Sequence, residues 1–198
     1  YINSPETNFF KKGSSLYNLD LARKLSNKID HIYLVEGYMD VIGLSKNGID
    51  NVVANLGTSL TDKQILTLNQ FFDDIIICFD GDESGYKAAL RAAENSIVEL
   101  KPEKEILFLF LPDSHDPDSY VNKHGKDKFI DFSNQNSIEI HKFIYNHYYK
   151  EIDRLINLLN SKSQNTQKII NYYRKSKKVK NTWGSLLHYI VFKKNVIL

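Results

Sequence analysis

Four short runs of aliphatic and aromatic residues, each closed by glycine, proline or aspartate, most strongly constrain the fold. Runs of this length and composition are typical of β-strands that are buried on both faces. They occupy residues 31–37 (HIYLVEG), 51–57 (NVVANLG), 74–82 (DIIICFDGD) and 105–113 (EILFLFLPD). Segments with helical spacing separate them at 38–48, 59–72 and 84–100. This alternation predicts an α/β fold, in which a mostly parallel central sheet is flanked by helices.

The pattern changes near residue 136. Segment 116–132 predicts one more helix, and after it no further strand is evident until the last residues. Segment 137–160 has apolar residues spaced by three or four and predicts an amphipathic helix, with a second candidate at 166–180. The sequence therefore predicts three parts, which are residues 1–29, an α/β domain over 30–136 and a helical extension over 137–198.

Composition narrows the class of protein. Hydrophobic residues at 42% and charged residues at 25% indicate a globular chain and exclude disorder as the default. No apolar run approaches the roughly 20 residues that span a bilayer, and the first residues lack a signal peptide, so a cytoplasmic protein is predicted. The single cysteine, Cys78, stands in a strand-like run and is predicted to be buried, which excludes a disulfide framework and a cysteine-rich zinc site.

Charge is divided along the chain. Ten basic residues and no acidic residue follow Asp153, so the residues up to Asp153 carry a net charge of −8 while the whole chain carries +2. Basic residues interleaved with Tyr172, Tyr173 and Trp183 would suit a grip on single-stranded nucleic acid through phosphate contacts and stacking. The competing interpretation, which we favour, is a solvated helix face beside an aromatic core stripe.

Acidic residues stand where three of the predicted strands end. In a parallel sheet the loops after the strands gather at one edge, where ligands bind. Like charges gathered there disfavour each other's ionisation unless a cation neutralises them. Carboxylates with open water positions suit Mg²⁺ or Mn²⁺, and such a site favours phosphoryl or nucleotidyl transfer. The acids are Glu36 and Asp40 after the first strand, Asp80 and Asp82 after the third, and Asp116 and Asp118 after the fourth.

These residues also have purely structural interpretations. Aspartates in Asp-x-Asp patterns are ordinary turn residues and helix caps, and Asp40 would serve equally as an exposed helix acid. Gly37 and Gly81 allow a tight turn and a close approach to a ligand. Gly57 and Thr58 would orient a phosphate or cap a helix. The combination of glutamate and glycine after one strand with Asp-x-Asp after another favours a functional site.

Four motifs, VEGYMD, LGTS, FDGDESG and HDPD, together resemble the Toprim domain, which is shared by bacterial DNA primases, topoisomerases and some nucleases. The stretch YINSPETNFFKKGSSLYNLDLAR followed by VEGYMDVIGL is similar to the catalytic core of bacterial DNA primases, and the resemblance extends to about residue 145. It implies a DNA-directed RNA polymerase that makes short RNA primers for replication. Residues 1–29 would then be the end of the N-terminal part of that core.

The resemblance also implies roles for individual residues. Glu36 would be the catalytic acid or base and, with Asp80 and Asp82, would hold two Mg²⁺ or Mn²⁺ ions. The remaining implied members are Asp116 and Asp118 in the acidic cluster, Asp40 as a supporting acid, and Lys12 beside the nucleotide and template. Taken alone, Lys12 would be interpreted as a solvated surface lysine.

Partners and alternatives follow from the same resemblance. It implies a single-stranded DNA template, ribonucleoside triphosphates, an RNA primer–DNA hybrid, and a replicative helicase bound through a domain absent from this chain. The zinc-binding module of such primases is also expected to be absent, so no zinc is predicted. Asn55 and His115 depart from the family pattern, but neither is an implied ligand. Two alternative functions are not excluded by the sequence: a Toprim nuclease or topoisomerase, and a fragment that binds metal and nucleotide without turnover. We expect little or no primer synthesis from this chain alone.

Overall fold

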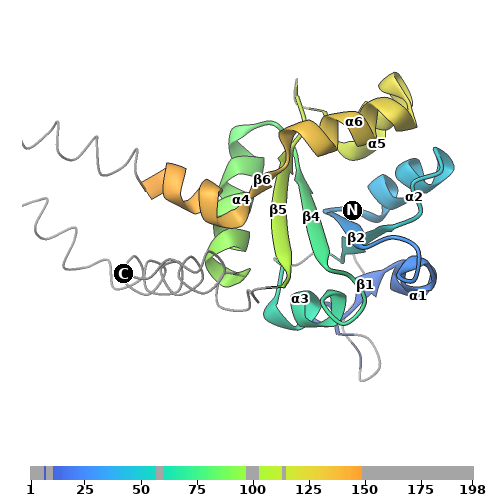
Figure 1. Cartoon of the computed structure of the whole chain (residues 1–198), viewed down its shortest axis with the longest axis horizontal. Coiled ribbons are helices and arrows are strands. Elements are labelled where there is room, and N and C mark those ends of the chain that lie inside the picture. The colour runs from blue at the N-terminus through green and yellow to red at the C-terminus, as the bar shows by residue number, and fades with distance from the viewer. Residues whose placement is uncertain (1–6, 8–10, 57–59, 97–102, 113–114, 149–198) are drawn as a thin grey trace, which may run out of the picture. The chain divides into compact units, whose positions relative to one another are not determined.

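Four parallel strands form the centre of the sheet in the computed structural model, which describes residues 7, 11–56, 60–96, 103–112 and 115–148 (Figure 1). The strands lie in the order β3-β2-β4-β5, so the second and third predicted runs flank the first. Their bounds are His31–Val35 for β2, Val52–Asn55 for β3, Asp74–Phe79 for β4 and Glu105–Phe110 for β5. All four coincide with predicted strands, and the α/β class with a mostly parallel sheet is confirmed.

Two short antiparallel strands flank this parallel core. β1 (Leu16–Tyr17) pairs with β3, and β6 (Ile138–Glu139) pairs with β5. Neither was predicted, and the sequence pattern had assigned residues 138–139 to the start of a helix. That assignment was wrong because the helix pattern begins to apply only at Ile140, from which residues 140–148 are helical.

Helices connect the strands at the predicted places. After the N-terminal α1 (Leu19–Ala22) and the short 3₁₀ helix η1 (Arg23–Leu25), the connections are α2 (Tyr38–Lys46), α3 (Asp62–Leu68) and α4 (Glu83–Ser96). The predicted capping box of α3 is confirmed, because Thr61 Oγ1 accepts a hydrogen bond from the Gln64 N–H at 3.3 Å and Gln64 Oε1 accepts one from the Thr61 N–H at 3.1 Å.

The single helix predicted over 116–132 is two helices. α5 (Pro117–His124) and α6 (Lys126–Asn136) are separated by Gly125, whose φ of 83° lies in the left-handed region. Glycine adopts this region without the steric cost that a Cβ would add. The prediction missed the break because the apolar residues on either side keep a helical spacing.

The sheet is covered on both faces. Alternate strand residues point to opposite faces, and Tyr33, Val35 and Cys78 share a buried cluster with residues of α2, α5 and α6, including Leu44 and Phe129. α3 and α4 lie over the other face, where α4 contacts β4 and β5 (Figure 1). The predicted burial of Cys78 is confirmed, and burial raises the pKa of its thiol.

The chain divides into two compact units, residues 1–140 and 141–198, and only the first part of the second unit is described. The predicted boundaries at 29/30 and 136/137 therefore stay predictions. The predicted helix at 166–180 and the basic and aromatic residues after Asp153 lie outside the described residues. None of the described helices is long and apolar enough to cross a membrane.

Candidate active site

The sheet topology brings the acidic residues to one edge. β2, β4 and β5 are parallel neighbours, so their carboxyl ends face the same way. Glu36 directly follows β2, Asp80 directly follows β4, and Asp116 is the N-cap of α5, the first helix after β5. Three separate strand-to-helix connections therefore converge here, as the sequence predicted.

Asp40 is fixed against the first of these connections. The Gly37 N–H, at the start of α2, donates a hydrogen bond to Asp40 Oδ2 at 3.1 Å. Burial, assisted by the Asp116 and Asp80 carboxylates, raises the pKa of Asp40 to about 6, against the lowering effect of the Gly37 and Asp118 backbone amides. Asp40 is therefore not the exposed helix acid of the alternative interpretation.

Neighbouring carboxylates also affect the pKa values of Glu36 and Asp80. Burial raises the pKa of Glu36, and the Asp80 and Asp82 carboxylates add to this, while the Arg91 guanidinium lowers it. Burial likewise raises the pKa of Asp80, with Asp116 and Asp82 as further causes. The carboxylates thus lie near enough to disfavour each other's ionised form, which is the electrostatic condition that a divalent cation relieves.

Asp82 and Asp116 have a structural role in addition. Asp82 Oδ1 accepts a hydrogen bond from the Gly85 N–H at 2.7 Å, and Asp116 Oδ1 accepts one from the Ser119 N–H at 2.7 Å. The bonds from Ser119 hold the pKa of Asp116 below its ordinary value. The helix-cap interpretation of both aspartates is therefore correct. It does not exclude a ligand role, because a carboxylate has a second oxygen with free lone pairs.

Gly81 lies tightly between the two aspartates and β5. A Cβ at this position would overlap the carbonyl oxygen of Leu111, which is a backbone atom and has no free rotation. Only glycine fits this approach, so the turn that carries Asp80 and Asp82 is held against the end of β5.

Asp118 points elsewhere. Its Oδ1 lies where a Cβ on Gly43 of α2 would be, and it accepts a hydrogen bond from Asn122 Nδ2 at 2.6 Å. Asn122 Oδ1 in turn accepts a bond from Asn47 Nδ2 at 3.2 Å, at the end of α2. The Asp118 carboxylate therefore joins α5 to α2, and its backbone amide, not its side chain, acts on Asp40.

The acids do not form a ready-made metal cage. Among the described residues, no three Asp, Glu, His or Cys side chains are placed so that they would hold an ion as they stand. The donor set nevertheless fits a hard divalent cation, since it consists of carboxylate oxygens whose pKa values are raised by burial and by the negative charge of their neighbours. Binding would therefore require these side chains to move from the positions they hold in the structure.

The residues predicted to contact nucleotide and template are Lys12, Gly57 and Thr58. Lys12 is half-buried beside the start of α3, where its carbonyl oxygen accepts a hydrogen bond from Gln64 Nε2 at 3.2 Å. Gly57 and Thr58 lie outside the described residues, so their predicted contact with phosphate stays a prediction.

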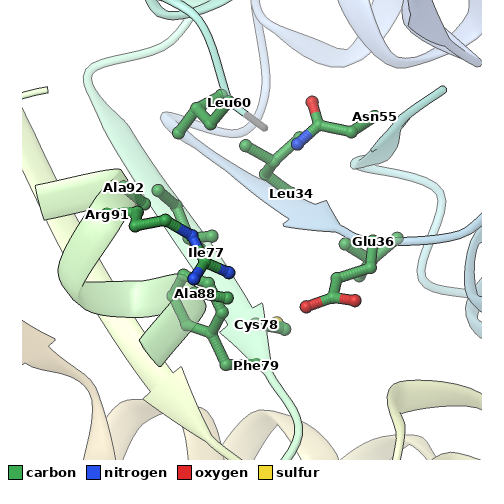
Figure 2. A pocket seen from close by; sticks show the side chains of 11 residues that line it. Leu34, Glu36, Asn55, Leu60, Ile77, Cys78, Phe79, Ala88, Arg91 and Ala92 are labelled. Atoms are coloured by element: carbon green, nitrogen blue, oxygen red, sulfur yellow. The ribbon is translucent and has the colours of Figure 1, made fainter. Parts of the chain in front are cut away.

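A pocket beside Glu36 contains two residues that the sequence did not single out as functional. It measures about 310 Å³ and lies between α4 and the sheet, with Leu34 and Ile77 among its apolar walls. Figure 2 shows Arg91 of α4 and Glu36 reaching into it from opposite sides, with Asn55 on the far wall. Arg91 is exposed and precedes the buried Ala92 on α4, so it lies beside the buried face of the helix, and no motif in the sequence marks it as functional.

Comparison with known proteins agrees with this geometry. Residues 30–109 match the Toprim domain. The chain is 42% identical over 153 residues to the DNA primase of Pseudomonas putida. The aligned region covers 77% of this chain and 23% of that protein. It therefore spans about a quarter of the length of the curated relatives it matches.

Solved structures give the same result. A DNA primase domain from Pseudomonas aeruginosa has 43% identity and a TM-score of 0.73, over 76% of this chain and 47% of that one. A DnaG primase catalytic domain bound to single-stranded DNA has 39% identity and a TM-score of 0.70, over 74% and 47%. The acidic edge described above thus belongs to a Toprim domain, and the chain belongs to the bacterial DNA primase family, within the part related to the catalytic core.

Proposed function

We propose that this chain is the Toprim-containing segment of a bacterial DNA primase, a nucleotidyltransferase that makes short RNA primers on single-stranded DNA. The single observation that carries the proposal is the convergence of Glu36, Asp80 and Asp116 from three parallel strands, with pKa values of Glu36 and Asp80 raised by burial and by neighbouring carboxylates. The relatives are named as primases, and one related catalytic domain was solved with single-stranded DNA. Both support the proposal.

In this proposal the acidic edge holds two Mg²⁺ or Mn²⁺ ions, and the chain holds no zinc. The ions would supply the positive charge that brings a 3′ hydroxyl to an α-phosphate and stabilises the leaving pyrophosphate. The ligands would be Glu36, Asp80, Asp82 and Asp116, each through an oxygen that is not already used in a helix cap. We retain Asp118 as a proposed member, although its carboxylate would first have to leave Gly43 and Asn122.

The remaining side chains position these acids. Asp40 fixes the Gly37 backbone beside Glu36, and the cap bonds of Asp82 and Asp116 limit the rotation of both carboxylates. Such preorganisation matters because nucleotidyl transfer depends on charge and position more than on covalent help from the protein. Glu36, which directly follows β2 and has a raised pKa, is the proposed acid or base.

The proposed substrates and partners follow from the relatives. They are a single-stranded DNA template, ribonucleoside triphosphates and an RNA primer–DNA hybrid, with Lys12, Gly57 and Thr58 near nucleotide and template. A replicative helicase would bind another part of the complete primase. The protein would act in the bacterial cytoplasm at the replication fork. We also propose the division into residues 1–29, 30–136 and 137–198, in which the last part extends the core as a partial helical bundle.

The test is primer synthesis by the complete enzyme. Glu36→Gln and Asp80→Ala should abolish dinucleotide synthesis and leave the circular dichroism spectrum unchanged. Glu83→Gln is the matched control, because Glu83 is a fully exposed neighbour that pairs with Lys87 and should not affect synthesis. Unchanged synthesis in the Glu36 and Asp80 variants would remove their catalytic assignment. Metal-dependent DNA cleavage without nucleotides would instead favour a Toprim nuclease.

A further inference from the structure

Arg91 carries a positive charge to the edge of the acidic cluster. Its guanidinium extends from α4 into the pocket of about 310 Å³ and faces the Glu36 carboxylate across it (Figure 2). The volume lies at the lower end of the ~300–1,000 Å³ range of small-molecule sites. The guanidinium and the carboxylate are not in direct contact, because no ion pair within 4.0 Å joins them.

Arg91 has unused hydrogen-bonding capacity. In the described part of the chain its guanidinium makes no hydrogen bond and no ion pair, although it has five N–H donors. Lys87, one helical turn earlier on α4, is already paired with Glu83. Two cations on one helix thus differ in role: one neutralises a neighbouring side chain, and the other points into a pocket with its donors unsatisfied.

The opposite wall adds a second unsatisfied group. Asn55 Oδ1 is buried and has no hydrogen-bond partner among the described residues. Buried amide oxygens are normally bonded, so Asn55 Oδ1 has unused capacity to accept a hydrogen bond. The pocket therefore has two polar side chains with unused capacity, Arg91 and Asn55, on either side of an apolar floor that includes Leu34 and Ile77.

We propose that Arg91 binds the β- and γ-phosphates of the incoming nucleoside triphosphate at the mouth of this pocket. The inference rests on the proposed function, since it needs a cation at Glu36. With a cation there, the space between Glu36 and Arg91 is flanked by positive charge on both sides and suits a polyphosphate. The guanidinium fork matches phosphate oxygens and binds them through two parallel hydrogen bonds.

This position gives Arg91 a defined part in the reaction. The 3′ oxygen of one nucleotide forms a bond to the α-phosphorus, and the bond from that phosphorus to its bridging oxygen breaks. Pyrophosphate leaves with the electron pair, and the proton of the hydroxyl passes to the Glu36 carboxylate, the proposed base. Negative charge grows on the leaving group during this step, and a guanidinium already in place stabilises it.

The experiment is calorimetric titration of magnesium pyrophosphate into the 198-residue chain. Arg91→Gln should weaken pyrophosphate binding at least tenfold, and Arg91→Lys should fall between, because an ammonium keeps the charge but lacks the fork. Lys87→Gln is the matched control and should bind as the unaltered chain does. Thermal unfolding midpoints of all variants should agree, because Arg91 and Lys87 are both exposed.

A parallel titration separates this inference from the proposed function. Mn²⁺ alone, followed by electron paramagnetic resonance, should bind the unaltered chain and Arg91→Gln equally well. Equal pyrophosphate binding by both chains, or no pyrophosphate binding by the unaltered chain, would overturn the role of Arg91. Loss of Mn²⁺ binding in Arg91→Gln would also overturn it, since Arg91 would then act by orienting Glu36. No Mn²⁺ binding by the unaltered chain would instead contradict the proposed metal site.

Discussion

Asp40 makes the stability of this fold depend on pH. Its pKa is about 6 in the folded chain, against an ordinary value of 3.8. The folded state therefore binds the Asp40 proton more tightly than the unfolded state does. Stability falls as pH rises from about 3.8 through about 6, and it levels off above that range. We expect Asp40→Asn to remove this part of the pH dependence.

The magnitude follows from the shift. An increase of about 2 pKa units, at about 1.4 kcal/mol each, gives an upper value of about 3 kcal/mol. Asp40 is only half-buried, so solvent screening reduces this to about 1–2 kcal/mol. Asparagine keeps an oxygen for the Gly37 N–H, so the α2 cap should survive. The variant should match the parent near pH 4 and exceed it by that amount at pH 7.

Urea unfolding of the metal-free chain at half-unit steps from pH 4 to 7.5 measures this difference. The slope that Glu36 and Asp80 contribute is common to both proteins and cancels in the comparison. Asp131→Asn, on the exposed surface of α6, controls for the loss of one negative charge. Parallel curves for the parent and Asp40→Asn would refute the argument, because they would show that Asp40 titrates alike in both states.

Three further substitutions test the packing around the site, each by urea unfolding. Gly43→Ala should cost about 1–3 kcal/mol because its Cβ would overlap Asp118 Oδ1, and a second change, Asp118→Ala, should recover only part of that loss, because the Cβ of residue 118 would still lie 2.9 Å away. Gly81→Ala should cost more and weaken Mn²⁺ binding, since the Leu111 carbonyl oxygen has no free rotation. Thr61→Ala should cost about 1 kcal/mol through the lost α3 cap, and an unchanged midpoint would contradict this.

The sequence predicted those parts of the fold that are determined by interactions between residues close together in the chain. The runs at β2 to β5 are apolar throughout because both faces of the sheet are covered, and that pattern is visible without a structure. The capping box of Thr61 and Gln64 involves residues three apart. β1 and β6 were missed because two residues carry no periodicity, and their conformation is set by the partners β3 and β5.

The features of the candidate site likewise separate into those that sequence could predict and those that depend on long-range packing. The convergence of Glu36, Asp80 and Asp116 could be predicted, since parallel strands must end at one edge. The direction of the Asp118 carboxylate could not, because it depends on a missing Cβ at Gly43, 75 residues earlier in the chain. The orientation of Arg91 toward Glu36 likewise requires the packing of α4 on the sheet, which no motif in the sequence encodes.

The two antiparallel strands have a consequence for self-association. β3 and β5, the outer members of the parallel core, have one side covered by a neighbour in the core and the other by β1 or β6. A second chain approaching either edge meets a strand of only two residues, which offers too few backbone groups to add a stable strand. Each short strand therefore shields two residues of the outer core strand beside it, Ala54 and Asn55 in β3 and Leu107 and Phe108 in β5, from pairing with a second chain.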